Sequence, residues 1–150
     1  MGVAHHTPYK LAQGDVDLFE RFRAENLPGL ELDPGRLAAV GSYLYLLTEQ
    51  APDLGGLRVI HHGWWLGTFR KGRFEPVHAL ALGLRSDQAR QVIEYRAQSA
   101  EIAAYLRGET LPSPGGNGWV LVCVDGYPLG WGKRAQAVLK NHYPRGLRHA

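Results

Sequence analysis

The chain has a single cysteine, Cys123, among its 150 residues, and no apolar run approaches the roughly 18 residues that a membrane-spanning helix needs. One cysteine excludes a disulfide framework within the chain and a zinc site built from cysteines. The first residues, MGVAHHTPYK, have neither the basic start nor the apolar stretch of a secretory signal. These absences predict a cytoplasmic protein without a membrane segment or a metal site.

Acidic residues are absent from residue 133 to the end of the sequence, although the formal net charge of the whole chain is only +3. The isoelectric point near 9.2 favours anionic partners. Thirteen of the 17 basic residues are arginine, whose planar guanidinium group suits phosphate and base contacts better than the ammonium of lysine does. A GC-rich coding sequence would produce the same bias, so the placement of the charges matters more than their total.

Short apolar runs bounded by Pro, Gly or Asp alternate with a few helical patterns along the chain. Asp15 is expected to cap the first helix and Pro28-Gly29 to end it, while Ser99 and Gly108 delimit the last. The expected helices cover residues 15–26, 76–82 and 99–108, and the expected strands cover 36–40, 43–47, 57–60, 64–69 and 91–95. Many short strands with two or three short helices predict an α+β fold around a small mixed β-barrel or curled sheet.

A hairpin is expected over residues 118–132, where two apolar runs meet at Asp125-Gly126. A two-residue Asp-Gly loop favours a type I′ turn. Unbroken pairing from that turn places one apolar set of side chains on the core face: Val120, Val122, Val124, Tyr127, Leu129 and Trp131. The opposite face then carries Trp119, Leu121 and Cys123 across from Gly132, Gly130 and Pro128, where the glycines admit either another protein segment or a ligand.

The segment after the hairpin holds the best candidates for a binding site: Lys133, Arg134, Lys140, Asn141, Tyr143, Arg145 and Arg148. There are no acids among them to form ordinary ion pairs, and the side chains of residues 141–143 can bond to and stack on nucleotides. The simpler interpretation is a solvated basic surface, and Tyr143 beside Pro144 is equally compatible with packing. Arg70, Lys71 and Arg73 form a second basic group at a predicted turn, where binding and ordinary surface charge are equally supported.

Two further groups of residues invite a chemical interpretation. Glu75 and His78 flank a predicted helix start and could act as an acid–base pair, but a cap residue and a histidine at the edge of the core account for them better. His61-His62 is followed by Trp64-Trp65, which suggests a metal site or an aromatic platform. Adjacent strand residues point to opposite faces, so the two histidines cannot easily share a metal ion. We interpret both groups as structural, with one tryptophan ring exposed.

The hairpin and tail, GWVLVCVDGYPLGWGK followed by LKNHYPRGLR, resemble the C-terminal PUA-like RNA-binding domain of RsmF-type RNA cytosine-C5 methyltransferases of the Nop/Sun group. LGTFRKGRFEPVHALAL, residues 66–82, and AAYLRGETL, residues 103–111, are similar to earlier parts of that domain. The resemblance covers about residues 57–148 in the right order. It implies a PUA-like barrel that binds RNA over residues 57–150, with a helix and short strands of residues 1–56 packed on its core.

The catalytic parts of that methyltransferase family have no counterpart in the sequence. Binding of S-adenosylmethionine needs a glycine-rich turn between a strand and a helix, whereas Val124-Asp125-Gly126 leads into another strand. Catalysis at cytosine C5 needs a reactive cysteine in a Pro-Cys or Thr-Cys setting, and Cys123 stands between two valines, where a thiol is inert. We therefore expect no catalytic site and no cofactor in these residues.

The resulting hypothesis is a non-catalytic module that positions structured ribosomal or transfer RNA for a methyltransferase catalytic domain, in cis or in trans. One alternative is an adaptor for protein interaction or ribosome assembly, whose basic C-terminal segment binds an acidic partner. Another is a small enzyme that uses Glu75 and His78.

Overall fold

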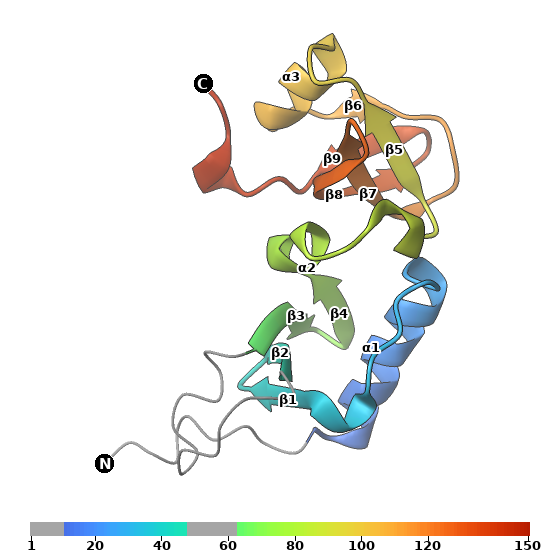
Figure 1. Cartoon of the computed structure of the whole chain (residues 1–150), viewed down its shortest axis with the longest axis vertical. Coiled ribbons are helices and arrows are strands. Elements are labelled where there is room, and N and C mark those ends of the chain that lie inside the picture. The colour runs from blue at the N-terminus through green and yellow to red at the C-terminus, as the bar shows by residue number, and fades with distance from the viewer. Residues whose placement is uncertain (1–10, 48–62) are drawn as a thin grey trace. The chain divides into compact units, whose positions relative to one another are not determined.

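The computed structural model describes residues 11–47 and 63–150, and the chain divides into two compact units (Figure 1). Unit 1 comprises Met1–Phe22 and Glu31–Leu80, and unit 2 comprises Arg23–Leu30 and Ala81–Ala150. Each unit contains one β-sheet, one of the two sheets curls into a half-barrel, and the fold is mixed α+β. The expected domain boundary at residues 56 and 57 lies outside the described residues.

The sheet of unit 1 has four antiparallel strands in the order β1-β2-β3-β4. They are β1 (Leu37–Val40), β2 (Tyr43–Leu47), β3 (Gly63–Arg70) and β4 (Arg73–Pro76), and α2 (His78–Leu82) follows them. β3 turns into β4 at Lys71-Gly72, where both residues have a positive φ, 51° and 73°. The strands expected over residues 36–40, 43–47 and 64–69 are confirmed. The strand expected over residues 57–60 lies outside the described residues.

One face of this sheet packs against α1 (Gln13–Asn26), the helix that continues from unit 1 into unit 2. The rings of Phe19 and Phe22 on α1 lie 5.1 and 4.9 Å from the ring of Phe74 on β4, measured between centroids. A side chain at Gly67 would overlap the Phe74 ring, so this glycine makes room for the aromatic cluster. The helix ends where expected but begins earlier, which places Asp15 in its first turn instead of at its cap.

The sheet of unit 2 has five strands in the order β5-β7-β8-β9-β6, with β5 parallel to β7 and the other pairs antiparallel. They are β5 (Val92–Tyr95), β6 (Leu111–Pro112), β7 (Gly118–Val124), β8 (Tyr127–Ala135) and β9 (Val138–Asn141). α3 (Ala100–Leu106) follows β5, and Ser99 caps it as predicted by accepting a hydrogen bond from the Ile102 N–H at 3.1 Å. Two short 3₁₀ helices, η4 (Ser86–Gln88) and η5 (Arg145–Leu147), also belong to this unit.

The core of unit 2 lies between α3 and the inner face of the sheet. Ile102 and Tyr105 of α3 pack there against apolar side chains of β7 and β9. The hydroxyl of the fully buried Tyr105 donates a hydrogen bond to the carbonyl oxygen of Trp131 on β8, at 2.9 Å. Tyr105 can approach so closely because residue 130 is a glycine, and a Cβ at Gly130 would overlap the hydroxyl. The glycine therefore admits a protein segment, the first of the two explanations for it.

The β7–β8 hairpin has the predicted turn. Asp125 and Gly126 have φ values of 49° and 88°, and Val124 pairs with Tyr127. Positive φ at both central residues defines the type I′ turn, whose twist matches that of the flanking strands.

The register beyond the turn differs from the prediction because β8 contains a β-bulge. Cys123 pairs with Pro128, but Val122 pairs with Gly130, so Leu129 is one extra residue in β8. One extra residue moves every later side chain of the strand to the opposite face of the sheet.

The assignment of Trp131 to the same face as Val120 and Val122 was therefore wrong. Trp131 pairs with Leu121 on the outer face, and the glycines of β8 lie on the inner face with the valines. The outer face is not exposed to solvent at these two positions, because Leu121 and Trp131 are both buried.

A second hairpin, between β8 and β9, gave no signal in the sequence. It turns at Gln136 and Ala137, whose φ values of 52° and 63° are unusual for residues other than Gly, Asn or Asp. The loop before β7 stabilises this turn: the Gln136 N–H donates to the side-chain oxygen of Asn117 at 3.1 Å, and the Ser113 N–H donates to the Ala137 carbonyl at 2.8 Å. Tertiary contacts here replace the usual turn chemistry.

Replacing Gly130 by Ala should lower the free energy of unfolding by about 1–3 kcal/mol, the usual range for overpacking a core. The added methyl group overlaps the Tyr105 hydroxyl, and the buried ring has little room to move. Chemical denaturation followed by circular dichroism measures the loss.

Gly146→Ala is the matched control in the same unit, because a Cβ there meets nothing within 4 Å. The cost of Gly130→Ala should also shrink in a Tyr105→Phe background, which lacks the hydroxyl. An equal cost in both backgrounds would show that another neighbour explains the glycine.

Candidate nucleic-acid interface

Two lysines face each other on the outer face of β8 and β9. Lys133 and Lys140 are direct cross-strand partners, and both are exposed. Opposed residues of antiparallel strands have their Cα atoms only about 4.5–5.5 Å apart, and like charges in such a pair are destabilising. Neither lysine takes part in an ion pair with any residue of the two described ranges. Two positive charges are thus held side by side on this sheet.

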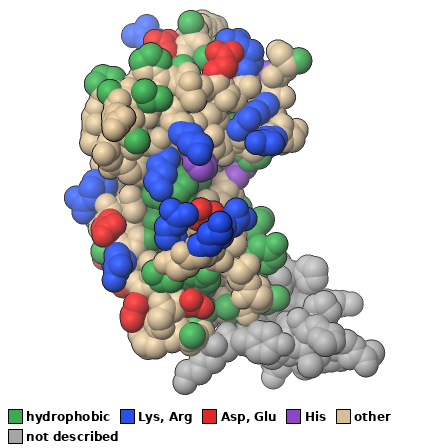
Figure 2. Space-filling view, turned by 180° about the vertical axis from the view of Figure 1, so that it is seen from behind, with side chains coloured by type: hydrophobic (Ala, Val, Ile, Leu, Met, Phe, Trp, Pro, Cys, Tyr) green, Lys and Arg blue, Asp and Glu red, His purple; other side chains and the backbone are tan. Residues whose placement is uncertain are grey.

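Aromatic rings lie beside the lysine pair. Trp119 on β7 is the cross-strand partner of Lys133, whose ammonium nitrogen lies 5.1 Å from the centroid of the Trp119 ring. The ring of His142 is 4.8 Å from the same ring. We call the four residues Trp119, Lys133, Lys140 and His142 the lysine face. Basic groups interleaved with rings are typical of nucleic-acid-binding surfaces, and many lysine and arginine side chains are exposed on the surface shown in Figure 2.

Arg134, the neighbour of Lys133, has an inward side chain. It is only 7% exposed. Its Nε donates to the Ser113 hydroxyl at 3.1 Å, and one terminal nitrogen donates to the Gln91 side-chain oxygen at 2.8 Å. The guanidinium group thereby ties the loop before β7 to the sheet, a structural role that accounts for its position without RNA.

Asn141 has a structural role as well. Its amide nitrogen donates to the carbonyl oxygens of Tyr105 and Glu109 at 2.8 and 3.0 Å, and its amide oxygen accepts from the Tyr143 N–H at 2.8 Å. The Tyr143 ring packs on Tyr105, 5.3 Å between centroids. Both residues hold the C-terminal segment against α3.

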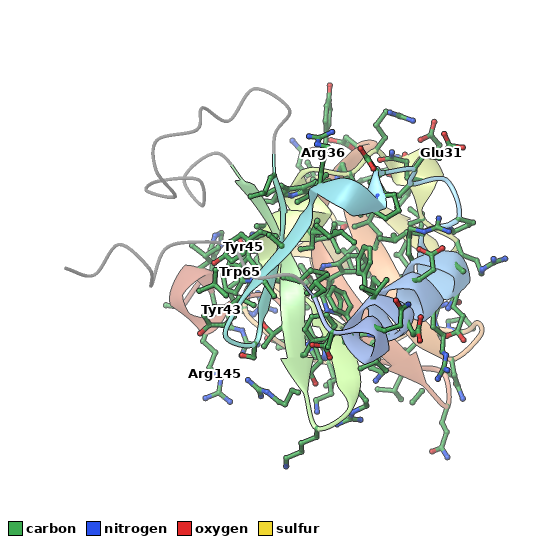
Figure 3. The ribbon with its side chains drawn as sticks, turned by 90° about the horizontal axis from the view of Figure 1, so that it is seen from below. Glu31, Arg36, Tyr43, Tyr45, Trp65 and Arg145 are labelled. Carbon is green, nitrogen blue, oxygen red and sulfur yellow. The ribbon has the colours of Figure 1, made fainter. Side chains whose placement is uncertain are left out.

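The two remaining tail candidates differ in their environment. Arg148 is half-buried, and its Nε donates to the Tyr143 carbonyl at 3.0 Å. Arg145 is exposed on η5 and points away from the ribbon (Figure 3). Among the tail candidates, the exposed basic side chains are therefore Lys133, Lys140 and Arg145.

The second basic group lies on unit 1, at the turn between β3 and β4. Arg70 and Arg73 are cross-strand partners, Lys71 occupies the turn, and all three are exposed. The Arg70 Nε lies 3.8 Å from a carboxylate oxygen of Glu75. The two basic groups predicted from the sequence thus belong to different units.

The pairs considered for other chemistry have ordinary environments. Glu75 is engaged with Arg70, and burial lowers the pKa of His78, which favours its neutral form. Trp64 is half-buried and donates its indole N–H to the Ala79 carbonyl at 2.9 Å, whereas Trp65 is the exposed ring of the two. His61-His62 lies outside the described residues. Within the described ranges, no three His, Cys, Asp or Glu residues are grouped to hold a metal ion.

Two family models match the chain. The model of the PUA domain of methyltransferase RsmF matches residues 92–149, and the model of the first C-terminal domain of the RsmF rRNA methyltransferase matches residues 21–84. The two matches do not overlap, and together they account for most of the chain. The chain carries two C-terminal domains of the RsmF type.

The RsmF matches also bear on the internal organisation of the chain. The PUA domain covers β5 to β9, whereas the resemblance seen in the sequence groups residues 66–82 with it. Those residues fall within the match to the first C-terminal domain. Both matched RsmF domains are non-catalytic, and no match to a methyltransferase catalytic domain is found in these 150 residues.

Cys123 has the environment of an inert thiol in this RsmF-type chain. It is completely buried, and burial, together with the nearby carboxylate of Glu94, raises the pKa of the thiol to about 12. The thiol therefore stays protonated at neutral pH and is a poor nucleophile.

Among the helices of the described residues, none has the length and the apolar content that a membrane span requires.

Cys123 should react with iodoacetamide at about pH 8 far more slowly in the native protein than in guanidinium, because the thiolate is the reactive form and burial suppresses it. Timed alkylation followed by mass spectrometry of the intact chain measures both rates. Similar rates in the native and unfolded protein would show that the thiol is accessible and ionised.

Replacing Arg134 by Lys should lower the free energy of unfolding by about 2 kcal/mol, the scale of a lost hydrogen bond with a charged partner. An ammonium group cannot reproduce the fork that reaches Ser113 and Gln91. The exposed Arg145→Lys variant is the control, with little change expected. An Arg134→Lys variant as stable as the parent protein would contradict the structural role of this guanidinium.

Proposed function

We propose that this chain binds structured RNA through the lysine face of its PUA domain and positions that RNA for a methyltransferase catalytic domain, in cis or in trans. The RsmF family supports the association with an RNA methyltransferase and favours ribosomal over transfer RNA as the ligand. The proposed setting is the cytoplasm.

The opposition of Lys133 and Lys140 is the observation that carries the proposal. A sheet gains nothing from two like charges in one cross-strand pair, and no carboxylate of the described residues forms an ion pair with either. A polyanion can neutralise both charges at once, and the counterions released from it favour binding. A phosphate backbone is therefore the ligand that best explains the pair.

The surroundings of the pair favour RNA with a defined shape. Trp119 and His142 contact each other beside the lysines, where they can meet a sugar or an accessible base. The strands below are held by the Tyr105 and Arg134 hydrogen bonds, so the charges are positioned before the ligand arrives. An acidic protein partner, the alternative ligand, would use the same charges but would not need the rings.

Replacing Lys133 and Lys140 together by Ala should weaken binding to a fluorescent ribosomal RNA stem-loop, measured by anisotropy over a range of salt concentrations. The slope of log affinity against log salt should become shallower by about 0.7–0.9 for each lysine. Stability should change by less than about 1 kcal/mol, because removal of the repulsion between the lysines offsets the loss of the cation–π interaction.

Arg21 and Arg96 provide the matched control, because both are exposed and lie away from the lysine face along the chain. Their double replacement by Ala removes the same net charge and should leave the slope nearly unchanged. If the lysine and arginine variants lose the same affinity and slope, the binding is non-specific. If neither variant loses affinity, the lysine face serves a protein partner.

A further inference from the structure

The four-stranded sheet of unit 1 has an outer face opposite the one that packs against α1. Tyr43 pairs with Thr68, and, after a bulge, Tyr45 pairs with Trp65, so these side chains share a face. Leu44, which alternates with the two tyrosines on β2, is fully buried on the other face. Figure 3 shows Tyr43, Tyr45 and Trp65 close together on β2 and β3. We call these three residues the aromatic face.

The three rings form one cluster of fixed geometry. The Trp65 ring lies 5.3 Å from the Tyr43 ring, nearly perpendicular to it, and 6.4 Å from the Tyr45 ring, nearly parallel to it. The Trp65 indole N–H donates to the Gly67 carbonyl at 3.0 Å, which fixes the orientation of the indole. Yet Trp65 is 36% exposed and Tyr43 46% exposed. Large rings that are fixed in place and still open to solvent mark an interaction surface.

Positive charge lies at the far end of the same face. The face continues along β3 and β4 to Thr68, Arg70 and Arg73. Arg70 is two residues beyond Thr68 and therefore shares its face, and Arg73 is the cross-strand partner of Arg70. Arg70 lies five positions beyond Trp65 on β3, which corresponds to at most about 17 Å along the strand. The only carboxylate that this stretch of β3 and β4 supplies is Glu75, in the ion pair with Arg70. The face therefore offers stacking surface at one end and net positive charge at the other.

We propose that this face binds a single-stranded segment of RNA, with unpaired bases stacked on Trp65 and Tyr43 and the adjoining phosphates contacting Arg70 and Arg73. Every base has a π-face, so exposed rings on a sheet bind single strands with little sequence preference, while basic groups track the backbone. The inference rests on the proposed function in taking RNA as the ligand. It concerns a different surface, on a different unit, and a different form of RNA.

Charge decides between RNA and a protein partner for this surface. An apolar patch on a partner protein would leave Arg70 and Arg73 desolvated against it without compensation. A single strand satisfies both parts of the face at once, because its bases and its phosphates alternate along its length.

The experiment uses the whole chain and an unstructured uridine decamer, and measures affinity by anisotropy. Trp65→Ala and Tyr43→Ala should each weaken binding roughly tenfold, the scale of one base stack, without changing the salt slope. Trp65→Phe, which keeps a ring, should retain most of the affinity. Replacing Arg70 and Arg73 by Ala should instead reduce the slope by about 0.7 for each phosphate that an arginine no longer neutralises.

Tyr127→Ala is the control for a general loss of aromatic surface, since Tyr127 is 74% exposed on the β7–β8 turn of unit 2. It should leave decamer affinity unchanged. Should Trp65→Ala fail to fold, Tyr43→Ala decides alone, because truncation of a ring that is nearly half exposed disturbs the sheet less. Ultraviolet crosslinking of the decamer, followed by peptide mapping, should place the crosslink on β2 or β3.

Unchanged decamer affinity in Tyr43→Ala and Trp65→Ala would overturn the inference and leave the face to a protein partner. The lysine variant distinguishes this failure from that of the proposed function. If Lys133→Ala with Lys140→Ala weakens stem-loop binding while the aromatic variants do not affect the decamer, only this inference fails. If the aromatic variants weaken decamer binding and the lysine variant does nothing, only the lysine face is wrong.

Discussion

The bulge at Leu129 determines which side chains of β8 face the core and which face outward. With unbroken pairing from the Asp125-Gly126 turn, Lys133 would lie on the inner face with the valines of β7, and Arg134 would point outward. One extra residue reverses this, so Lys133 meets Lys140 and Trp119 outside while Arg134 reaches Ser113 inside. The same shift brings Gly130 to the inner face, where Tyr105 needs the space. Core packing and surface charge thus depend on one backbone irregularity.

The bulge also explains how far the sequence could predict this fold. Most local signals were reliable: Asp-Gly and Lys-Gly predicted the turns, Ser99 predicted a cap, and most expected strands of the described residues are present. The cap predicted at Asp15 was the exception. Each of these signals comes from residues that lie within the turn, cap or strand that they predict. The bulge and the Gln136-Ala137 turn have no such local signal, because interactions with α3 and with the loop before β7 stabilise them. Those interactions could be found only after the tertiary structure was known.

The sequence predicted which residue types form the candidate site, but not which of their side chains are exposed. The exposure depends on tertiary interactions, as the bulge does. An acid-free segment is visible in the sequence, whereas the side on which each cation lies depends on strand register. Arg134, Asn141 and Arg148 make hydrogen bonds within the unit, and these account for their positions without any ligand. Lys133 and Lys140 have no such bonds among the described residues and bear the repulsion of their pairing. Exposure together with the absence of a hydrogen-bond or ion-pair partner among the described residues, more than charge itself, separates the binding candidates from the structural residues.

The lysine face and the aromatic face would bind RNA through different interactions. Contacts of the lysine face with phosphates are sensitive to salt and insensitive to sequence, and they suit a backbone of fixed shape. Stacking on the aromatic face is nearly independent of salt and requires unpaired bases. The two surfaces would therefore select different parts of an RNA: the lysine face selects a phosphate backbone, and the aromatic face selects unpaired bases.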